Sequence, residues 1–241
     1  MAGPVKTEAI VLRSLRYGEA DRILHLYTPM RGRVGAIAKG VRRTKSRFGG
    51  RLEPFFHLNL ILHEGRSDLL TVTSVETVAP HARLRVDGPA LDAAARACDA
   101  VSRLFETTEP HPAVFALLAN ELGLLDRDPA AHATHANQLA FRLKLLLAAG
   151  LAPQLAACAS CGEPDHLVAF SGREGGVVCG GCEAQGFPLE AGAHAFMRTA
   201  IGTPLAQVPR VEARLLAQVE RAIGETVEHH GAGRLRAAWP G

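Results

Sequence analysis

The segment VGAIAKGVRRTKSRFGGRLEPF, Val34–Phe55, decides how the first third of the chain folds. It opens with small apolar residues in an alternating pattern that is typical of a β-strand, and it continues as a glycine-containing connection. Eight Lys and Arg residues and no Asp or Glu occur between residues 31 and 51. The segment therefore predicts a strand followed by a long, strongly cationic loop. The eight cations of residues 31–51 are Arg31, Arg33, Lys39, Arg42, Arg43, Lys45, Arg47 and Arg51.

Four more strand patterns surround this segment. EAIVLRSLR and DRILHLYT precede it, and PFFHLNLILHEG and DLLTVTSVETV follow it. Each is rich in aliphatic and β-branched residues, and turn residues separate them. Five short strands with one long connection between the third and the fourth predict a small barrel of the oligonucleotide-binding (OB) type. We therefore expect an OB-type nucleic-acid-binding domain over residues 1–79.

From residue 80 onward the apolar residues recur with a helical period. The predicted class is therefore α+β: the five-stranded OB-type barrel is followed by an all-α domain over residues 80–241. Into this helical domain a cysteine-bearing module is inserted at about residues 155–187.

Proline and glycine mark the expected helix ends. The first helix has Pro89 in its first turn and an apolar face, and the second begins near Pro112 and ends at Gly123. The third is expected to start with Asp128 as its cap and to stop at Gly150, and the last to cover about residues 211–229. The predicted apolar face of the first helix is Leu91, Ala95, Cys98, Val101 and Phe105, and that of the third is Leu139, Leu143, Leu146 and Leu147.

The charge is distributed very unevenly. The whole chain carries a formal charge of +3, so the residues outside 31–51 sum to −5. Such asymmetry indicates a localised site for a polyanion, although charge runs also occur in loops that are merely solvated. No apolar run approaches the length of a membrane span, and Lys6 and Glu8 argue against a secretory signal, so we expect a cytoplasmic, nucleoid-associated protein.

Four cysteines follow the pattern C-x2-C-x17-C-x2-C. Two such turns can direct four thiolates at one centre, so the spacing predicts a tetrahedral zinc site. Because four cysteines leave no position for water, the single zinc ion is expected to be structural. Two disulfides or redox-active pairs are the alternatives, and neither suits a cytosolic chain without a thioredoxin-like pattern. The predicted ligands are Cys158, Cys161, Cys179 and Cys182, whereas Cys98 is expected to pack in a helical core.

No catalytic motif is recognisable. Gly35–Arg42 resembles a phosphate-binding loop, but the Lys and Ser/Thr that must follow its second glycine are replaced by Val41 and Arg42. Histidines are numerous, yet none lies in a nucleophile or zinc-hydrolase motif. We therefore expect a protein that is not an enzyme.

The cationic loop is predicted to bind nucleic acid. A membrane-binding segment would carry large apolar anchors, which the loop lacks, whereas an OB-type barrel binds single strands with cations and stacking aromatic residues. Since little in the loop could read base edges, binding should tolerate many sequences. A zinc-ribbon protein that binds RNA or assists transcription is the alternative. The predicted nucleic-acid contacts are Tyr17, Arg33, Lys39, Arg42, Arg43, Lys45, Arg47, Phe48 and Arg51.

Several segments together resemble the RecO family of bacterial recombination mediators. They are GEADRILHLYTP, GRVGAIAKGVRRTKSRFGGRLEPF, FRLKLLLAAGLAPQLAACASCG and FSGREGGVVCGGC. The resemblance runs from about Ile10 to the C-terminus, and all four zinc cysteines, which some members lack, are present.

This resemblance implies an OB domain and a helical domain that holds the zinc site. It also implies a non-enzymatic role in DNA repair, in which the protein binds single- and double-stranded DNA, anneals complementary strands and helps load the recombinase RecA onto coated strands. The implied partners are RecR and the acidic tail of the single-stranded DNA-binding protein. We expect Arg142 and Lys144, beside the apolar face of the third helix, to dock that tail.

Overall fold

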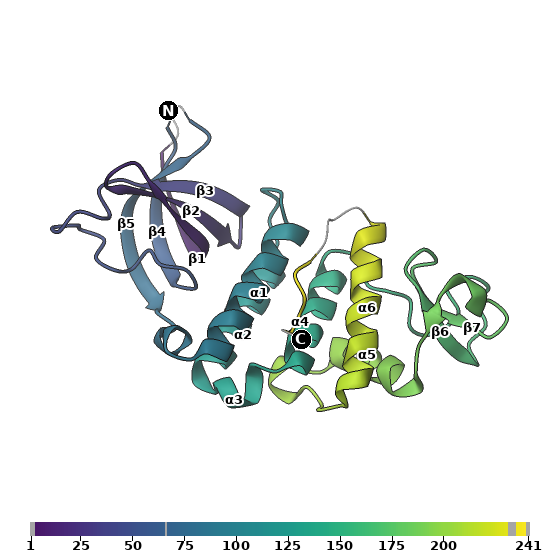
Figure 1. Ribbon diagram of the computed structural model, residues 1–241. Helices are drawn as coiled ribbons and strands as arrows, with labels where there is room; N and C mark the ends of the chain where they lie inside the picture. Colours follow the sequence, from purple (N-terminus) through teal and green to yellow (C-terminus); the bar gives the residue numbers. More distant parts are fainter. Residues whose placement is uncertain (1–2, 66, 231–234, 240–241) are drawn as a thin grey trace. The chain divides into compact units, whose positions relative to one another are not determined.

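The structure is a computed structural model that describes residues 3–65, 67–230 and 235–239. The chain divides into two compact units, Met1–Pro129 and Ala130–Gly241, which we call the N-terminal and the C-terminal unit. The N-terminal unit contains five strands and two long helices, and the C-terminal unit contains the remaining helices and a small sheet (Figure 1). The predicted α+β class, with a five-stranded sheet before a helical part, is confirmed.

The five N-terminal strands close into a barrel in the order β1-β2-β3-β5-β4. All neighbours are antiparallel except β3 and β5, which run parallel, and this closure removes exposed strand edges. The bounds are β1 Pro4–Tyr17, β2 Asp21–Thr28, β3 Gly32–Ala38, β4 His57–His63 and β5 Leu70–Ala79.

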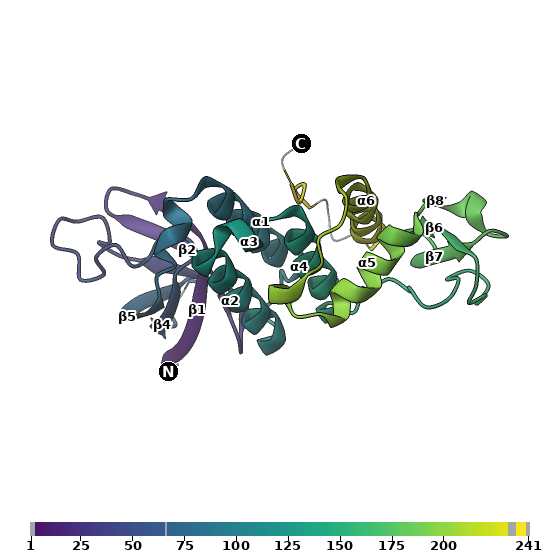
Figure 2. The same ribbon diagram turned by 90° about the horizontal axis from the view of Figure 1, so that it is seen from below.

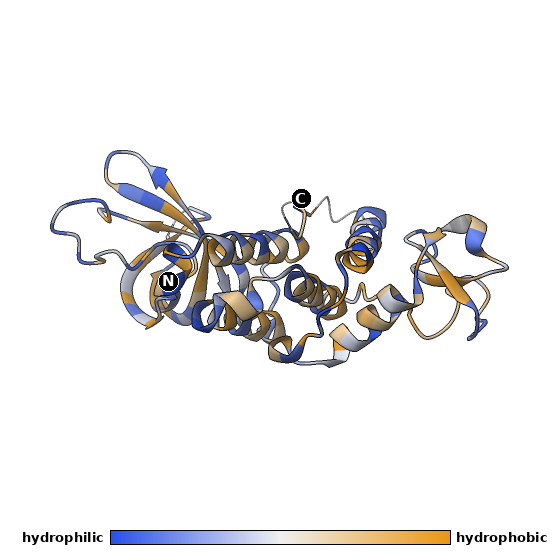
Figure 3. Cartoon of the chain, turned by 60° about the horizontal axis from the view of Figure 1, so that its bottom comes forward, coloured by the Kyte–Doolittle hydropathy of each residue, from blue (hydrophilic) through white to orange (hydrophobic). Residues whose placement is uncertain are grey.

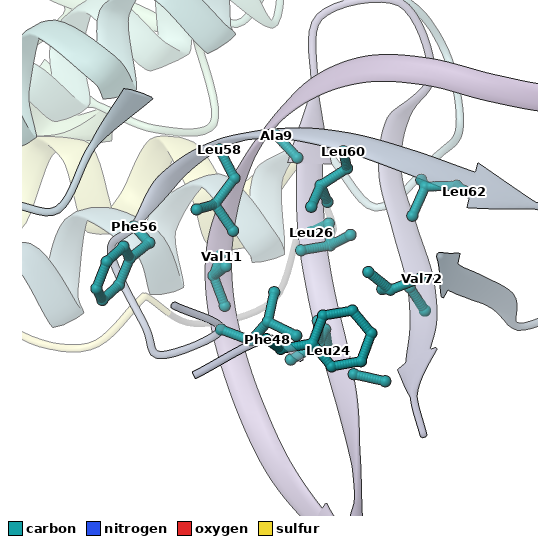
Figure 4. Packing of buried hydrophobic residues seen from close by; sticks show 13 residues of the cluster. Ala9, Val11, Leu24, Leu26, Phe48, Phe56, Leu58, Leu60, Leu62 and Val72 are labelled. Atoms are coloured by element: carbon teal, nitrogen blue, oxygen red, sulfur yellow. The ribbon is translucent and has the colours of Figure 1, made fainter. Parts of the chain in front are cut away.

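Alternating residues of these strands fill the barrel. Leu24 and Leu26 of β2 and Leu58, Leu60 and Leu62 of β4 are at most 2% exposed (Figure 4). Burial of such a side chain contributes on the order of 2 kcal/mol. The inward positions therefore determine the register, since a shift by one residue would expose all of them.

Two helices complete the N-terminal unit. The short 3-10 helix η1 (Ala82–Arg85) leads into α1 (Gly88–Leu104), and α2 (Pro112–Arg127) follows. Asp87 caps α1 by accepting a hydrogen bond from the backbone N–H of Ala90. Both helices contact barrel strands, so the compact unit extends to Pro129. The division into domains at residues 79 and 80 remains a prediction.

The C-terminal unit combines helices with a small three-stranded sheet of order β7-β6-β8 (Figure 2). Both α4 and α5 contact α6, and strand β6 also contacts α6. In Figure 3 the helices carry hydrophilic and hydrophobic residues on different sides, as packing on one face requires. The bounds are α3 Pro129–His132, α4 His135–Ala148, β6 Leu167–Ser171, β7 Gly176–Cys179, η2 Glu183–Gln185, β8 Phe187–Pro188, α5 Ala191–Gly202, η3 Leu205–Gln207 and α6 Ala213–His229.

Several predicted helix ends are wrong. Helix α2 continues through Gly123 to Arg127, and its C-cap Asp128 directly precedes α3, which begins at the predicted Pro129. The predicted third helix is split into α3 and α4, because Thr134 starts a new helix by accepting a hydrogen bond from the backbone N–H of Asn137. Helix α5 was not predicted at all.

The predicted apolar faces are partly corrected. Leu91 of α1 is 41% exposed and Leu147 of α4 is 52% exposed. The buried face of α1 instead consists mainly of alanines, which allow a close approach of neighbouring elements. Its members are Ala90, Ala93, Ala94, Ala97, Cys98, Ala100 and Val101.

Candidate nucleic-acid interface and metal site

The connection between β3 and β4, residues 39–56, is the cationic loop of the N-terminal unit, and we call it the basic loop. Its start is fixed by a 2.7 Å hydrogen bond from the backbone N–H of Gly40 to Asp21 Oδ1. Near its end, Glu53 forms a 2.7 Å ion pair with Arg22 of β2. Hydrogen bonds and ion pairs to β2 therefore hold both ends of the loop.

The middle of the basic loop is held by apolar side chains. Phe48 and Leu52 are each 1% exposed and belong to the barrel core, where Figure 4 shows Phe48 beside Leu24. A positive φ at Gly49 lets the chain turn directly after Phe48. The predicted stacking role of Phe48 is therefore wrong, because its ring is buried in the barrel and is not available to a base.

The cations of the basic loop project away from this core. Six of the predicted contacts lie on this loop and are exposed. Among the described residues none of them takes part in an ion pair, although the Arg47 guanidinium lies 4.8 Å from the centre of the Phe48 ring. The loop therefore presents its charges without neutralising partners. These six are Lys39, Arg42, Arg43, Lys45, Arg47 and Arg51.

The other two predicted contacts lie on strands. Tyr17, at the end of β1, is 53% exposed and is accessible for stacking. Arg33 of β3 is half-buried, and its Nη1 donates a 3.1 Å hydrogen bond to the carbonyl oxygen of Ser102. Neither residue lies within the basic loop, so their roles stay predictions.

Two residues that the sequence analysis did not single out lie on the outer face of the barrel. Arg13 of β1 is exposed and pairs across the strands with His25 of β2. A β-bulge between Val11 and Arg13 brings the two together. No sequence pattern marks this bulge, because Ala9–Leu12 are all apolar and therefore do not distinguish the two registers.

The predicted tail-docking pair does not form an exposed patch. Arg142 is 3% exposed, and it donates to the carbonyl oxygen of Arg236 and lies 3.8 Å from Glu220. Lys144 Nζ donates a 2.7 Å hydrogen bond to the carbonyl oxygen of Ile201, and burial lowers the pKa of its ammonium group. Arg142 is therefore not available to dock an acidic tail, and this part of the expectation is corrected, whereas the role of the half-buried Lys144 stays a prediction.

The four predicted cysteines converge at one end of the small sheet of the C-terminal unit. Cys158 and Cys161 lie in the turn that precedes β6, and Cys179 and Cys182 lie at the end of β7 and beyond it. All four sulfur atoms lie within 4.8 Å of one another, and the Cys161 and Cys179 sulfurs are 3.6 Å apart. No other described group of three or more potential ligands has this geometry.

This cluster fits a metal ion. Zinc–sulfur bonds of about 2.3 Å in a tetrahedron place the sulfurs about 3.8 Å apart, close to the distance found here. Although burial raises the pKa of the Cys158 thiol, hydrogen bonds from the backbone N–H groups of Cys179, Cys161 and Ser160 lower it to about 6. At Cys161 a backbone hydrogen bond from Glu163 lowers the pKa, but hydrogen bonds with the Cys158 and Cys179 side chains raise it to about 12. The thiolate, the form that binds metal, is therefore favoured at Cys158 and not at every cysteine of the cluster.

In the described part of the chain, no helix combines the length and the apolar character that a bilayer crossing requires.

The architecture defines a class: a protein with an OB-type barrel, a helical part and a four-cysteine module that could hold a metal ion. Two family models match the chain, "Recombination protein O N terminal" over residues 1–81 and "Recombination protein O C terminal" over residues 85–238. The chain belongs to the RecO family of DNA repair proteins, which supports a role in recombinational repair.

Its relatives carry the same description. A protein from Anaeromyxobacter dehalogenans (strain 2CP-C) named "DNA repair protein RecO" is 39% identical, and the alignment covers 97% of this chain and 94% of the relative. Proteins of the same name from Rubrobacter xylanophilus and a Nocardioides species are 35% and 43% identical, over 98% and 75% of this chain and 95% and 75% of the relatives. These descriptions name no enzymatic activity.

Proposed function

We propose that the protein binds single- and double-stranded DNA through the basic loop and anneals complementary single strands. The observation that carries this proposal is the group of six exposed cations on that loop, none of which is ion-paired among the described residues. Such cations bind phosphates and release counterions, which supplies affinity that does not depend on sequence.

Annealing follows from the same charges without any bond chemistry. Two complementary strands repel each other, and a cationic surface between them lowers that repulsion. Because Phe48 and Leu52 anchor the loop in the barrel, its charges keep a defined position while the strands search for their register. Tyr17 and Arg33 extend the surface to the neighbouring strands.

We assign residues 1–79 to nucleic-acid binding and residues 80–241 to a scaffold that contains one structural zinc ion. Cys158, Cys161, Cys179 and Cys182 would hold the ion, which would fix two turns that contain few large apolar side chains. A closed set of four thiolates leaves no position for a substrate, so the ion would serve folding.

We further propose that the protein helps load RecA onto strands coated by single-stranded DNA-binding protein, in the bacterial cytoplasm and near the nucleoid. Membership of the RecO family supports this role, as well as partnership with RecR and with the acidic tail of the coating protein. Because Arg142 is buried, the proposal keeps only Lys144 of the predicted pair as a docking residue for that tail.

The test compares strand annealing by the parent protein and by the triple variant R42A/R43A/K45A. Arg47 is kept because its guanidinium packs on Phe48. The matched control is R173A/R198A/R210A, which removes three exposed arginines from the C-terminal unit. We expect the loop variant to anneal DNA at least about tenfold more slowly and the control to anneal at the parent rate.

Equal annealing rates for the loop variant and the parent would contradict the proposal. Parallel measurements on complementary RNA oligonucleotides separate the mediator from an RNA-binding protein. Preference for DNA supports the mediator, and strong preference for RNA would favour the alternative.

A further inference from the structure

A β-bulge in strand β1 changes the face of the barrel to which the Arg13 side chain points. Before the bulge, Val11 faces the barrel core opposite Leu26, and after it Arg13 opposes His25, which alternates with the buried Leu24 and Leu26. One inserted residue reverses the facing of every side chain that follows. The bulge thus moves a guanidinium from the core side to the outer side of the barrel.

Arg33 of β3 lies on the same outer face. His25 pairs with Gly35 across β2 and β3, and Arg33 precedes Gly35 by two residues, so its side chain shares the face of His25. Diagonal neighbours of this kind lie about 7 Å apart, within reach of long side chains. Arg13, His25 and Arg33 therefore form one cluster across three strands, in the region where OB-type barrels bind their ligands.

The charges of this cluster are not neutralised. Among the described residues no carboxylate forms an ion pair with Arg13 or Arg33, and Arg33 is steadied by the carbonyl oxygen of Ser102. The neighbouring Arg31, in contrast, forms a 2.7 Å ion pair with Glu64. The cluster keeps its positive charge available.

A cavity of about 390 Å³ opens beside Arg33. Gly35 forms part of it, and a Cβ there would come within 2.7 Å of the Leu69 side chain. Asp68 is the one carboxylate in the lining, Arg31 is paired with Glu64, and the lining residues other than these and Arg33 are uncharged. The space accommodates a ligand group that reaches the Arg33 guanidinium. The lining consists of Arg31, Arg33, Val34, Gly35, Asp68, Leu70 and Thr108.

The surroundings of His25 disfavour its protonated form. Burial, followed by the charges of Arg33 and Arg13, lowers the pKa of its imidazole. The neutral ring between two cations would gain a proton when an anion offsets their charge.

We propose that Arg13, His25 and Arg33 form a second phosphate-binding site, and that a nucleic-acid strand bound there places a proton on His25. This inference rests on the proposed nucleic-acid function and adds Arg13 and His25 to the contact that the proposed function already gives to Arg33. The ligand is a backbone phosphodiester, which the two guanidiniums and the imidazolium bind together.

The sign of the pH effect follows from linkage. The complex holds one proton more than the free protein, because the phosphate raises the pKa of His25 in the complex above its value in the free protein. Affinity therefore rises as the pH falls through the pKa of the complex and levels off below that of the free protein.

The experiment measures binding of a single-stranded DNA oligonucleotide at constant ionic strength between about pH 6 and about pH 8. We expect the parent to bind about fivefold more tightly at the lower pH. His25→Gln should bind weakly with a flat profile, and His25→Arg should bind tightly with a flat profile. His63→Gln, an exposed histidine of β4, is the matched control and should keep the slope of the parent.

Calorimetry in two buffers of different ionisation enthalpy measures the proton directly, and uptake should disappear in both His25 variants. An unchanged pH profile in His25→Gln, while R42A/R43A/K45A loses binding, would overturn this inference and leave the proposed function intact. Full binding by the loop variant would instead contradict the proposed function. A His25-dependent response to inorganic phosphate alone, with none to the oligonucleotide, would overturn the assignment of the ligand.

Discussion

The basic loop and the four-cysteine module are both long, glycine-containing segments with few large apolar residues, and they are held in place in different ways. The basic loop inserts Phe48 and Leu52 into the barrel core. The module brings Cys158, Cys161, Cys179 and Cys182 together around a position suited to a metal ion. In one segment burial supplies the anchor, and in the other a metal ion would supply it.

This difference decides what each segment can offer to a partner. In the basic loop two apolar side chains, a hydrogen bond to Asp21 and one ion pair hold the backbone, so six cations remain exposed. In the module the most reactive side chains are the four cysteines, and these are the groups that would bind the metal ion. An exposed cationic surface and a four-cysteine cluster thus arise from two segments that are anchored differently.

The largest expected effect is on the module. Removal of zinc with a chelator, or Cys179→Ser, should unfold residues of about 155–187, since metal binding in such modules is worth on the order of 10 kcal/mol. Limited proteolysis and metal analysis measure the loss. Cys98→Ala is the control, because Cys98 lies in α1 and should leave the zinc content at one ion. Full protease resistance of the metal-free protein would contradict the anchoring role.

The second effect concerns the burial anchor of the basic loop. Phe48→Ala should lower the free energy of unfolding by about 3–5 kcal/mol, because it leaves a cavity in the barrel core. Urea denaturation measures the change. Arg47→Ala, its exposed neighbour, should cost less than about 1 kcal/mol. A small effect of Phe48→Ala would mean that the ring does not anchor the loop.

A smaller effect is expected at the start of the loop. Asp21→Ala removes the acceptor for the backbone N–H of Gly40 and should destabilise the N-terminal unit by about 1–2 kcal/mol. Asp21→Asn keeps an acceptor oxygen and should retain more than half of that stability. Hydrogen exchange of the Gly40 amide distinguishes the variants, and equal protection in all three proteins would rule out this contact as an anchor.

The smallest effect concerns the C-terminal segment of the C-terminal unit, where Glu220 binds both His135 and the backbone N–H of Ala238. Although burial raises the pKa of Glu220, these hydrogen bonds and the charges of His135 and Arg142 lower it below the usual 4.5. The stabilisation, about 1 kcal/mol, is present above pH 4.5 and is lost as the pH falls through the lowered pKa.

Trp239, which stacks on His135, is the only tryptophan of the chain and reports this contact by fluorescence. Its emission should shift below pH 4.5 in the parent, and Glu220→Gln should show the shifted emission at neutral pH. Identical emission from both proteins across this range would show that Glu220 does not hold the segment.

The sequence allowed the strand pattern and the metal site to be predicted because both depend on local spacing. Two C-x2-C turns bring sulfurs together whatever surrounds them, and alternation along β2 and β4 specifies which residues face inward. Phe48 could not be placed in the same way. Glycines and arginines surround it, and only closure of the barrel provides a core for its ring.

The helix ends and the cluster of Arg13, His25 and Arg33 could not be predicted from the sequence either, because they depend on tertiary contacts. Asp128 precedes α3 and Thr134 caps α4, and the continuous apolar pattern of the sequence does not show that the helix is interrupted between them. Helix α5 contains Gly192, a poor helix former, and has no side-chain cap. The bulge that brings Arg13 to His25 becomes visible only when β1 is paired with β2.

The most direct test of the account is the salt dependence of single-stranded DNA binding. If the basic loop supplies about six phosphate contacts, log K should fall with log salt with a slope of about −4 in the parent, and R42A/R43A/K45A should reduce that slope by about 2. The control R173A/R198A/R210A should keep the slope of the parent. A slope that is the same in the parent and in the loop variant would show that DNA binds elsewhere on the molecule.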